Sequence, residues 1–278
     1  MSLTDSTPYN VQAPPGAPSK KTAVRRVTAG SITRRKGEQP FAVITAYDAP
    51  FARYAEEAGI DIILVGDSLG MVVLGYESTT SVTLDDMLHH TAAVRRGSSR
   101  AHIVTDLPFG TYQASDADAI RAAARVVQEG GATSVKIEGG VRAANRIKAI
   151  TGAGIPVMGH IGVLPQTAGL GPGFKIRGNH DALLADAQAV QEAGAYAVVL
   201  EVVDHQIAAE ITRTLRIPTI GIGSGAHCDG QVLVLHDVLG LYPDTPSFAK
   251  RYDDLHARAV EALSQYAQNV KDKLFPVE

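Results

Sequence analysis

The chain has 278 residues, a formal net charge of −3, 45% hydrophobic and 20% charged residues. No stripe of Lys and Arg interleaved with aromatic residues occurs, so the composition does not favour a nucleic-acid-binding protein. The hydrophobic content is ordinary for a globular protein, and this length allows either two domains or one barrel domain.

The N-terminal segment is the first feature along the chain. Residues 1–21 are rich in Pro, Ser and Thr and lack the basic start and apolar centre of a secretory signal. We expect a flexible tail here and a single domain over residues 22–278. No apolar run approaches the roughly 20 residues needed to cross a bilayer, and the single cysteine, Cys228, excludes an internal disulfide. These features predict a cytoplasmic protein without a membrane partner.

Short apolar runs alternate with Ala-rich segments from residue 41 onward. The eight candidate strands cover residues 41–48, 60–68, 102–109, 134–139, 156–162, 197–203, 218–224 and 231–237. Because these runs are continuously apolar, they predict strands buried on both faces, as in a parallel sheet covered by helices. Eight successive strand–helix units favour an α/β fold of the (β/α)8 TIM-barrel type, with a doubly wound open sheet as the alternative.

The intervening segments have helical periodicity. Residues 115–131 place Ile120, Ala123, Ala124 and Val127 on one face, and Ser115 is a suitable N-cap. Glycines follow several of these segments and mark helix ends.

The last segment, 247–274, predicts a long amphipathic helix. Its apolar stripe consists of Tyr252, Leu255, Ala259, Leu263, Tyr266 and Val270. The sequence leaves open whether this helix closes the barrel or contacts a neighbouring subunit.

Polar residues stand where the predicted strands end. They are Asp48, Asp67, Ser68, Asp106, Lys136, Glu138, His160 and Glu201. In a (β/α)8 barrel the carboxyl ends of the strands carry the active site, so these side chains are expected to converge. A buried carboxylate is costly unless it is compensated, and several together predict a cation. Carboxylates without Cys or clustered His indicate a hard divalent ion, Mg²⁺ above all.

Each of these residues also has a structural interpretation. Asp67 and Asp106 could form turns, Glu138 could cap a helix starting near residue 141, and Lys136 could pair with Glu138 on the same strand. These interpretations work singly, but they do not explain why all the polar residues fall at the same end of successive strands.

The functional interpretation assigns different chemistry to each residue type. Lys136 is a candidate partner for a substrate carboxylate or oxyanion, and Glu201, flanked by apolar residues, is a candidate general base. His160 is equally compatible with a structural and a catalytic role. The glycine-rich run 221–225 could hold an anion. No role is assigned to Cys228.

Together these segments resemble one family, the ketopantoate hydroxymethyltransferases. The resemblance spans about residues 22–276 and rests on TAYD (45–48), LVGDSLGMVVLGYEST (64–79), HTAAVRRG (90–97), DLPFGTY (106–112), VKIEGG (135–140), GHIGVLPQ (159–166) and GIGSGAHCDGQVLVLHD (221–237). Residues 169–187 and the ending FPVE depart from the family's pattern.

The resemblance implies a barrel of the phosphoenolpyruvate/isocitrate-lyase type that acts in pantothenate biosynthesis. It would transfer a hydroxymethyl group from 5,10-methylenetetrahydrofolate to 3-methyl-2-oxobutanoate through an enolate held by Mg²⁺. By resemblance, Asp67 and Asp106 are metal ligands, and Glu138 is a water-mediated metal contact. The oxoacid would be bound by Asp67, Ser68, Asp106 and Lys136, with Glu201 as proton acceptor and His160 as a possible accessory residue. The family's usual assembly implies a homodecamer.

Two other functions remain to be weighed. One is a carbon–carbon lyase or mutase acting on a related oxoacid. Relatives with such activities resemble one another in a cysteine-containing loop at the mouth of the barrel, and no such cysteine is found here, which disfavours this function. The other is a non-catalytic barrel that binds oxoacid or folate, which has no need of a buried base such as Glu201.

Overall fold

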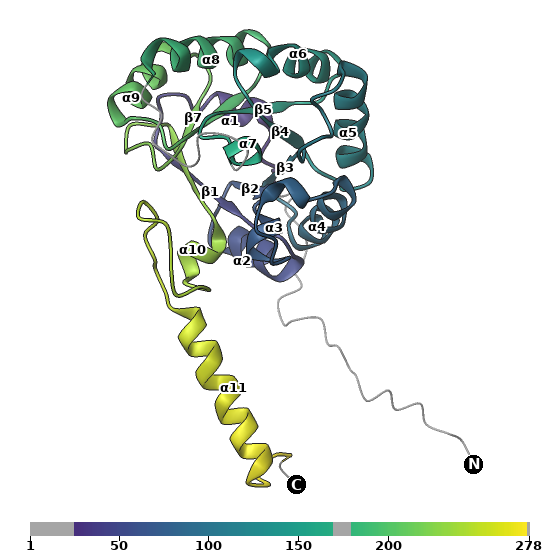
Figure 1. Ribbon diagram of the computed structural model, residues 1–278, viewed down its shortest axis with the longest axis vertical. Coiled ribbons are helices and arrows are strands. Elements are labelled where there is room, and N and C mark those ends of the chain that lie inside the picture. The colour runs from purple at the N-terminus through teal and green to yellow at the C-terminus, as the bar shows by residue number, and fades with distance from the viewer. Residues whose placement is uncertain (1–24, 169–178, 277–278) are drawn as a thin grey trace, which may run out of the picture.

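The protein forms a closed barrel of eight parallel strands. The computed structural model describes residues 25–168 and 179–276. The strands are β1 (Phe41–Thr45), β2 (Ile62–Val65), β3 (His102–Asp106), β4 (Ser134–Glu138), β5 (Val157–Gly162), β6 (Ala197–Glu201), β7 (Thr219–Ile222) and β8 (Gly230–Leu233). Each pairs with the next, and β8 pairs with β1 (Figure 1). The predicted TIM barrel is confirmed, and the open sheet is wrong.

Helices surround this barrel. The main outer helices are α2 (Ala49–Glu57), α4 (Leu84–Gly97), α5 (Asp116–Gln128), α6 (Ala144–Gly152), α8 (His180–Glu192) and α9 (His205–Thr214). Shorter helical segments are α1 (Ala29–Thr33), α3 (Leu69–Val72), η1 (Thr79–Ser81), η2 (Val141–Ala143), α7 (Pro165–Ala168) and α10 (Leu235–Leu239). The chain ends in α11 (Leu255–Lys271). The outer helices pack side by side around one side of the barrel, in the order α2, α4, α5, α6, α8 and α9 (Figure 1).

Two apolar clusters hold this architecture together. One fills the barrel interior with inward residues such as Val43, Ile62 and Val104, and Ile32 of α1 joins it. The other lies between the outer strand faces and the helices, with Ile63, Ile103 and their neighbours. Strands β2 to β6 are therefore buried on both faces along nearly all their length, which explains why their sequences do not alternate between apolar and polar residues. In β1 and β8, Ala42 and Gln231 are exposed.

Local signals set the helix boundaries. The Ser115 side chain accepts a hydrogen bond from the Asp118 amide, so the predicted N-cap of α5 is confirmed. The buried face of α5 consists of Ala119, Ala122, Ala123 and Val126. The predicted face was therefore displaced by about one residue, because small alanines rather than Ile120 pack against the barrel.

Three further expectations need correction. No helix lies between β7 and β8, because the short connection 223–229 leads directly from one strand to the next. Residues 235–237, predicted as strand, begin α10. The C-terminal helix starts at Leu255, so Tyr252 precedes it.

Helix α11 lies apart from the barrel. Figure 1 shows it projecting away from the strands, and none of its residues is buried. Closure of the barrel by this helix within one chain is therefore wrong. The predicted N-terminal tail, 1–21, lies outside the described residues. Among the described helices, none combines the length and apolarity needed to cross a bilayer.

Candidate functional site

A large cavity of about 630 Å³ lies at the carboxyl ends of the strands. Asp67, Ser68, Asp106, Lys136 and Glu201 all line it. They come from β2, β3, β4 and β6 and the residues that follow them, because parallel strands in a barrel bring their carboxyl ends to one rim. The predicted convergence of these five residues is observed.

Asp106 lies at the centre of the charged cluster. It faces Lys136 across the β3–β4 register, and the Lys136 Nζ donates to Asp106 Oδ1 at 2.5 Å. The Asp67 amide donates to Asp106 Oδ2 at 3.1 Å. Lys136 thus pairs with the neighbouring strand, so its expected structural pairing with Glu138 is not the closest contact.

The cluster carries more negative than positive charge. Burial raises the pKa of Asp67 well above its usual value, and the charges of Asp106 and Glu138 raise it further. Burial acts against the charge on Lys136, but Asp106, Glu138 and Asp67 together raise the pKa of Lys136. The Lys136 ammonium group compensates these three carboxylates only in part, and with His160 set against Glu138 and Glu201 the acidic groups still outnumber the basic ones.

Gln166 orders the carboxylates on the far side of this cluster. Its Nε2 donates to Asp67 Oδ2 at 2.8 Å and to the Leu107 carbonyl at 2.9 Å. Its backbone amide donates to Glu138 Oε2 at 3.2 Å. Gln166 is 1% exposed, so these bonds lie in a dry environment and hold Asp67 and Glu138 in place.

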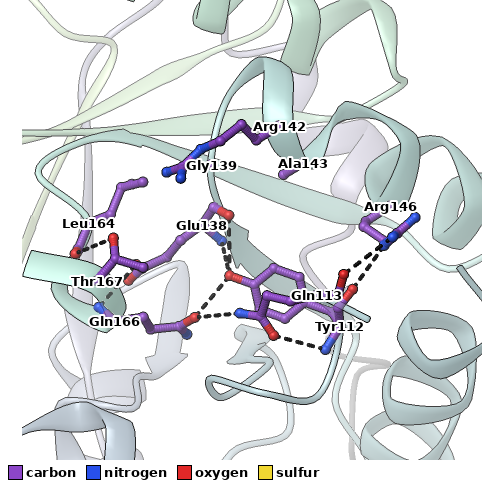
Figure 2. Close-up of a pocket in the computed structure, with 10 residues that line it drawn as sticks. All are labelled: Tyr112, Gln113, Glu138, Gly139, Arg142, Ala143, Arg146, Leu164, Gln166 and Thr167. Atoms are coloured by element: carbon purple, nitrogen blue, oxygen red, sulfur yellow. Dashed lines mark hydrogen bonds between the residues drawn. The ribbon is translucent and has the colours of Figure 1, made fainter. Parts of the chain in front are cut away.

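A second cavity of about 240 Å³ adjoins the cluster. Figure 2 shows Tyr112, Glu138 and Gln166 meeting at its wall. The Tyr112 hydroxyl donates to Gln166 Oε1 at 2.9 Å and accepts from the Glu138 amide at 3.2 Å. Glu138 does not cap the following helix, whose start has no side-chain cap.

His160 lies between two carboxylates. Its Nδ1 is 3.5 Å from Glu138 Oε1, and its Nε2 is 3.2 Å from Glu201 Oε2. Burial and the charge of Lys136 act against protonation, but the two carboxylates raise the pKa of His160 to about 9. The imidazolium is therefore the expected form at neutral pH, and it links Glu138 to Glu201.

The turn after β6 holds Glu201 at the cavity. The Ser224 hydroxyl donates to the Leu200 carbonyl at 2.7 Å and accepts from the Val203 amide at 3.0 Å. Val202 has a φ of 50°, which is rare for a β-branched residue and stores backbone strain next to Glu201. Such strain is typical of functional sites. The Glu201 side chain is 16% exposed, so it is accessible from the cavity.

Ser68 is held by a tyrosine. The hydroxyls of Tyr47 and Ser68 are 2.9 Å apart. Burial raises the pKa of Tyr47, so its hydroxyl stays protonated and can orient Ser68.

Asp48, Ser224 and Cys228 have structural contacts within the protein. Asp48 accepts a hydrogen bond from the Phe51 amide as N-cap of α2, so it does not join the carboxylate cluster. In the run 221–225, the Ser224 hydroxyl bonds to the Leu200 carbonyl and the Val203 amide, and anion binding by this run stays a prediction. Cys228 is buried and burial raises the pKa of its thiol.

The residues present fit a magnesium ion. Within residues 25–168 and 179–276, no three His, Cys, Asp or Glu side chains form a metal-binding group. Asp67 and Asp106 are nevertheless adjacent, buried and undercompensated, and Mg²⁺ is commonly held by one or two carboxylates with waters and substrate oxygens. Both oxygens of Glu138 already face Gln166 or His160, which suits a contact through water.

Comparison with known proteins decides the family. The sequence model of the family "Ketopantoate hydroxymethyltransferase" matches residues 26–278. A 3-methyl-2-oxobutanoate hydroxymethyltransferase from Carboxydothermus hydrogenoformans is 54% identical over 259 residues, which cover 91% of this chain and 94% of that protein. The chain belongs to the ketopantoate hydroxymethyltransferase family. As a member of this family it is an enzyme, a transferase, so the non-catalytic barrel is rejected.

Solved structures support the barrel type. A 2,3-dimethylmalate lyase of the PEP mutase/isocitrate lyase superfamily matches with a TM-score of 0.59 at 17% identity, covering 91% of this chain and 90% of that one. A phosphonopyruvate hydrolase in complex with oxalate and Mg²⁺ matches with a TM-score of 0.57 at 14% identity, covering 89% and 88%. At this identity the likeness shows the fold alone, so a lyase or mutase activity is not assigned to this chain.

Three residues of the site were missed from the sequence. Gln166, Tyr112 and Tyr47 contribute buried hydrogen bonds around the carboxylates. Each lies within a segment that carries the family resemblance, but amide and phenol groups do not stand out as ligands or bases. Only their partners, which come from distant parts of the chain, reveal their roles.

Proposed function

We propose that the protein converts 3-methyl-2-oxobutanoate, 5,10-methylenetetrahydrofolate and water into 2-dehydropantoate and tetrahydrofolate, a step of pantothenate biosynthesis. The observation that carries this proposal is that Glu201 opens onto the same cavity as the Asp67–Asp106–Lys136 cluster. Removal of a proton next to a keto group needs a base and a charged site that anchors the substrate, and this cavity offers both.

The proposal assigns the oxoacid to the charged end of the cavity. Lys136 would attract its carboxylate, and the Ser68 hydroxyl, held by Tyr47, would orient it. Asp67 and Asp106 would hold Mg²⁺, with Glu138 contacting it through water. Mg²⁺, when bound, supplies positive charge that polarises the keto oxygen and acidifies the neighbouring carbon.

Glu201 is proposed to take the proton from C3 of the oxoacid. The electron pair of that C–H bond then forms the new bond from C3 to the one-carbon unit of the folate. Both bonds from the one-carbon unit to the folate nitrogens N5 and N10 break, and the hydroxyl of the water takes the second position on that carbon. The two nitrogens receive the proton that Glu201 removed and the remaining proton of the water. His160, held against Glu201 at 3.2 Å, would stabilise the carboxylate as the base before the proton is taken.

We also propose the binding partners, the assembly and the location of the protein. The partners would be small molecules, and the assembly a homo-oligomer. The exposed apolar stripe of α11 supports a subunit contact. A cytoplasmic location follows from the pathway proposed.

The test follows the fate of the oxoacid with and without folate. With Mg²⁺ in deuterated water and no folate, C3 of 3-methyl-2-oxobutanoate should exchange its proton. With 5,10-methylenetetrahydrofolate added, 2-dehydropantoate should appear in equal amount to tetrahydrofolate. Turnover of the oxoacid that ignores the folate would contradict the proposal and favour a lyase.

A further inference from the structure

Asp237 is a buried carboxylate that the chemistry above does not use. It lies on α10, directly after β8, and is 9% exposed. Among residues 25–168 and 179–276, its carboxyl group has no hydrogen-bond donor and no cationic partner, and burial alone raises its pKa. The oxygens of Asp237 are not among the fully buried polar atoms without a partner, and its side chain lines the large cavity, so a bound molecule can donate hydrogen bonds to it there.

The cavity has more room than a small oxoacid requires. Its volume of about 630 Å³ is in the range of sites for drug-sized ligands. The charged residues occupy one part of its lining, while most of the remaining wall is apolar, including Val72, Val202 and Ile222. Asp237 thus belongs to a largely apolar compartment that continues from the oxoacid site.

The rim of this compartment carries an aromatic side chain. Phe248 lies in the connection between α10 and α11 and is 42% exposed. Its ring lies against Gly223, where an added Cβ would be 3.1 Å from the ring. A half-exposed aromatic ring at the mouth of an apolar cavity favours a flat aromatic ligand.

We propose that Asp237 binds the pteridine ring of the folate co-substrate by accepting hydrogen bonds from its N3–H and 2-amino groups. These two donors lie side by side on one edge of the ring, and a carboxylate offers two acceptors at matching spacing, as in bidentate guanidinium pairs. The apolar walls and Phe248 would cover the faces of the ring. The inference rests on the proposed function, because it takes folate as the co-substrate.

Other occupants of this position fit less well. No second carboxylate acts on Asp237 in the described part of the chain, so a divalent cation would have a single protein ligand there. A second general base is not needed, because Glu201 opens onto the same cavity. A flat ring with two adjacent N–H donors would donate to both oxygens of the carboxyl group, and its faces would pack against the apolar walls.

The first experiment measures the binding of tetrahydrofolate by calorimetry without oxygen. Asp237→Asn puts an amide NH₂ where an acceptor is needed, so its dissociation constant should rise about 10- to 100-fold. Asp244→Asn removes the same charge from the exposed connection after α10 and should bind like the unaltered protein. An Asp237→Asn protein that binds tetrahydrofolate within twofold of the unaltered protein would overturn the inference.

A second measurement needs no variant. A tetrahydrofolate analogue that lacks the 2-amino group should bind the unaltered protein at least tenfold more weakly than tetrahydrofolate. In Asp237→Asn the two ligands should bind with similar affinity. Equal affinity of both ligands for the unaltered protein would contradict a carboxylate contact to this edge of the ring.

C3 proton exchange separates this inference from the proposed function. Exchange without folate tests the oxoacid half of the site, which Asp237 does not contact. If the unaltered protein neither exchanges C3 nor binds tetrahydrofolate, the proposed function fails. If it does both and Asp237→Asn keeps full folate affinity, only the inference on Asp237 fails.

Discussion

Lys136 and Asp106 are register partners on β4 and β3, and they form an ion pair of 2.5 Å between side chains that are 5% and 4% exposed. A pair this deeply buried is sensitive to loss of one partner, because the remaining charge is left without compensation. Here the sensitivity is larger, since Asp67 and Glu138 add negative charge to the same site.

Replacing Lys136→Met should lower the free energy of unfolding by about 3–5 kcal/mol. The lysine pairs directly with Asp106 and its charge also acts on Glu138 and Asp67, and methionine keeps much of its volume without the charge. Denaturant unfolding without metal measures the effect. The exposed Lys148→Met serves as control and should change stability by less than about 0.5 kcal/mol. Adding Asp106→Asn to Lys136→Met should recover part of the loss, and no recovery would argue against the pair.

Replacing Glu201→Gln should abolish the base while keeping the oxoacid site. C3 exchange in deuterated water should slow by about 10²- to 10⁴-fold, whereas binding of the oxoacid with Mg²⁺ should persist. Proton NMR follows the exchange and calorimetry follows the binding. Glu192→Gln, an exposed position at the end of α8, is the matched control. Undiminished exchange in Glu201→Gln would remove this residue from the mechanism.

Replacing Asp67→Asn should separate metal binding from folding. Burial and repulsion from Asp106 and Glu138 disfavour its charge, so the metal-free variant should be at least as stable as the unaltered protein. Mg²⁺-dependent oxoacid binding should fall by tenfold or more. Thermal unfolding and calorimetry test the two halves, with Asp244→Asn as control. Unchanged Mg²⁺-dependent binding of the oxoacid would contradict the assignment of Asp67 as a metal ligand.

His102 should make the fold sensitive to acid. Burial lowers the pKa of His102 from 6.5 to about 4, and its Nε2 lies near Ser134 and Tyr196 beneath the barrel interior. Because the folded pKa is the lower one, the unfolded chain takes up the proton first as the pH falls. The stability contributed by neutral His102 is complete above about pH 6.5 and is lost toward pH 4, by about 3 kcal/mol.

The measurement compares free energies of unfolding from pH 7 to pH 4. The variant His102→Gln should lose about 3 kcal/mol less stability over this range than the unaltered protein. His227→Gln, at an exposed position, should follow the unaltered protein. Parallel pH curves for His102→Gln and the unaltered protein would contradict the shifted pKa.

Helix α11 should be a subunit contact. Leu263 and Tyr266 are 67% and 55% exposed on its apolar stripe, although both are large apolar side chains. Leu263→Arg combined with Tyr266→Arg should therefore shift the assembly to smaller species in light scattering coupled to size exclusion. Gln268→Arg adds a charge to the opposite face and should leave the assembly unchanged. A double variant with the original mass would show that the stripe is not an interface.

The sequence by itself determined the barrel and the members of its rim. Continuous apolar runs such as 60–68 and 197–203 indicate strands buried on both faces, and eight of them, most separated by helical segments, favoured a parallel barrel over an open sheet. The polar residues that end them, Asp67, Asp106 and Glu201 among them, follow from the same pattern. Periodicity and strand ends are local properties, so they can be read without the structure.

Tertiary structure alone decided how these residues act together. The pairing of Lys136 with Asp106, the place of His160 between two carboxylates, and the bonds of Gln166 join residues from different strands and loops. Asp48 follows a strand as Asp67 does, yet it caps a helix. Asp237 has no hydrogen-bond donor or cationic partner among the described residues, although its sequence context gives no sign of this. Contacts between distant segments depend on register and packing, and these are properties of the closed barrel rather than of any one segment.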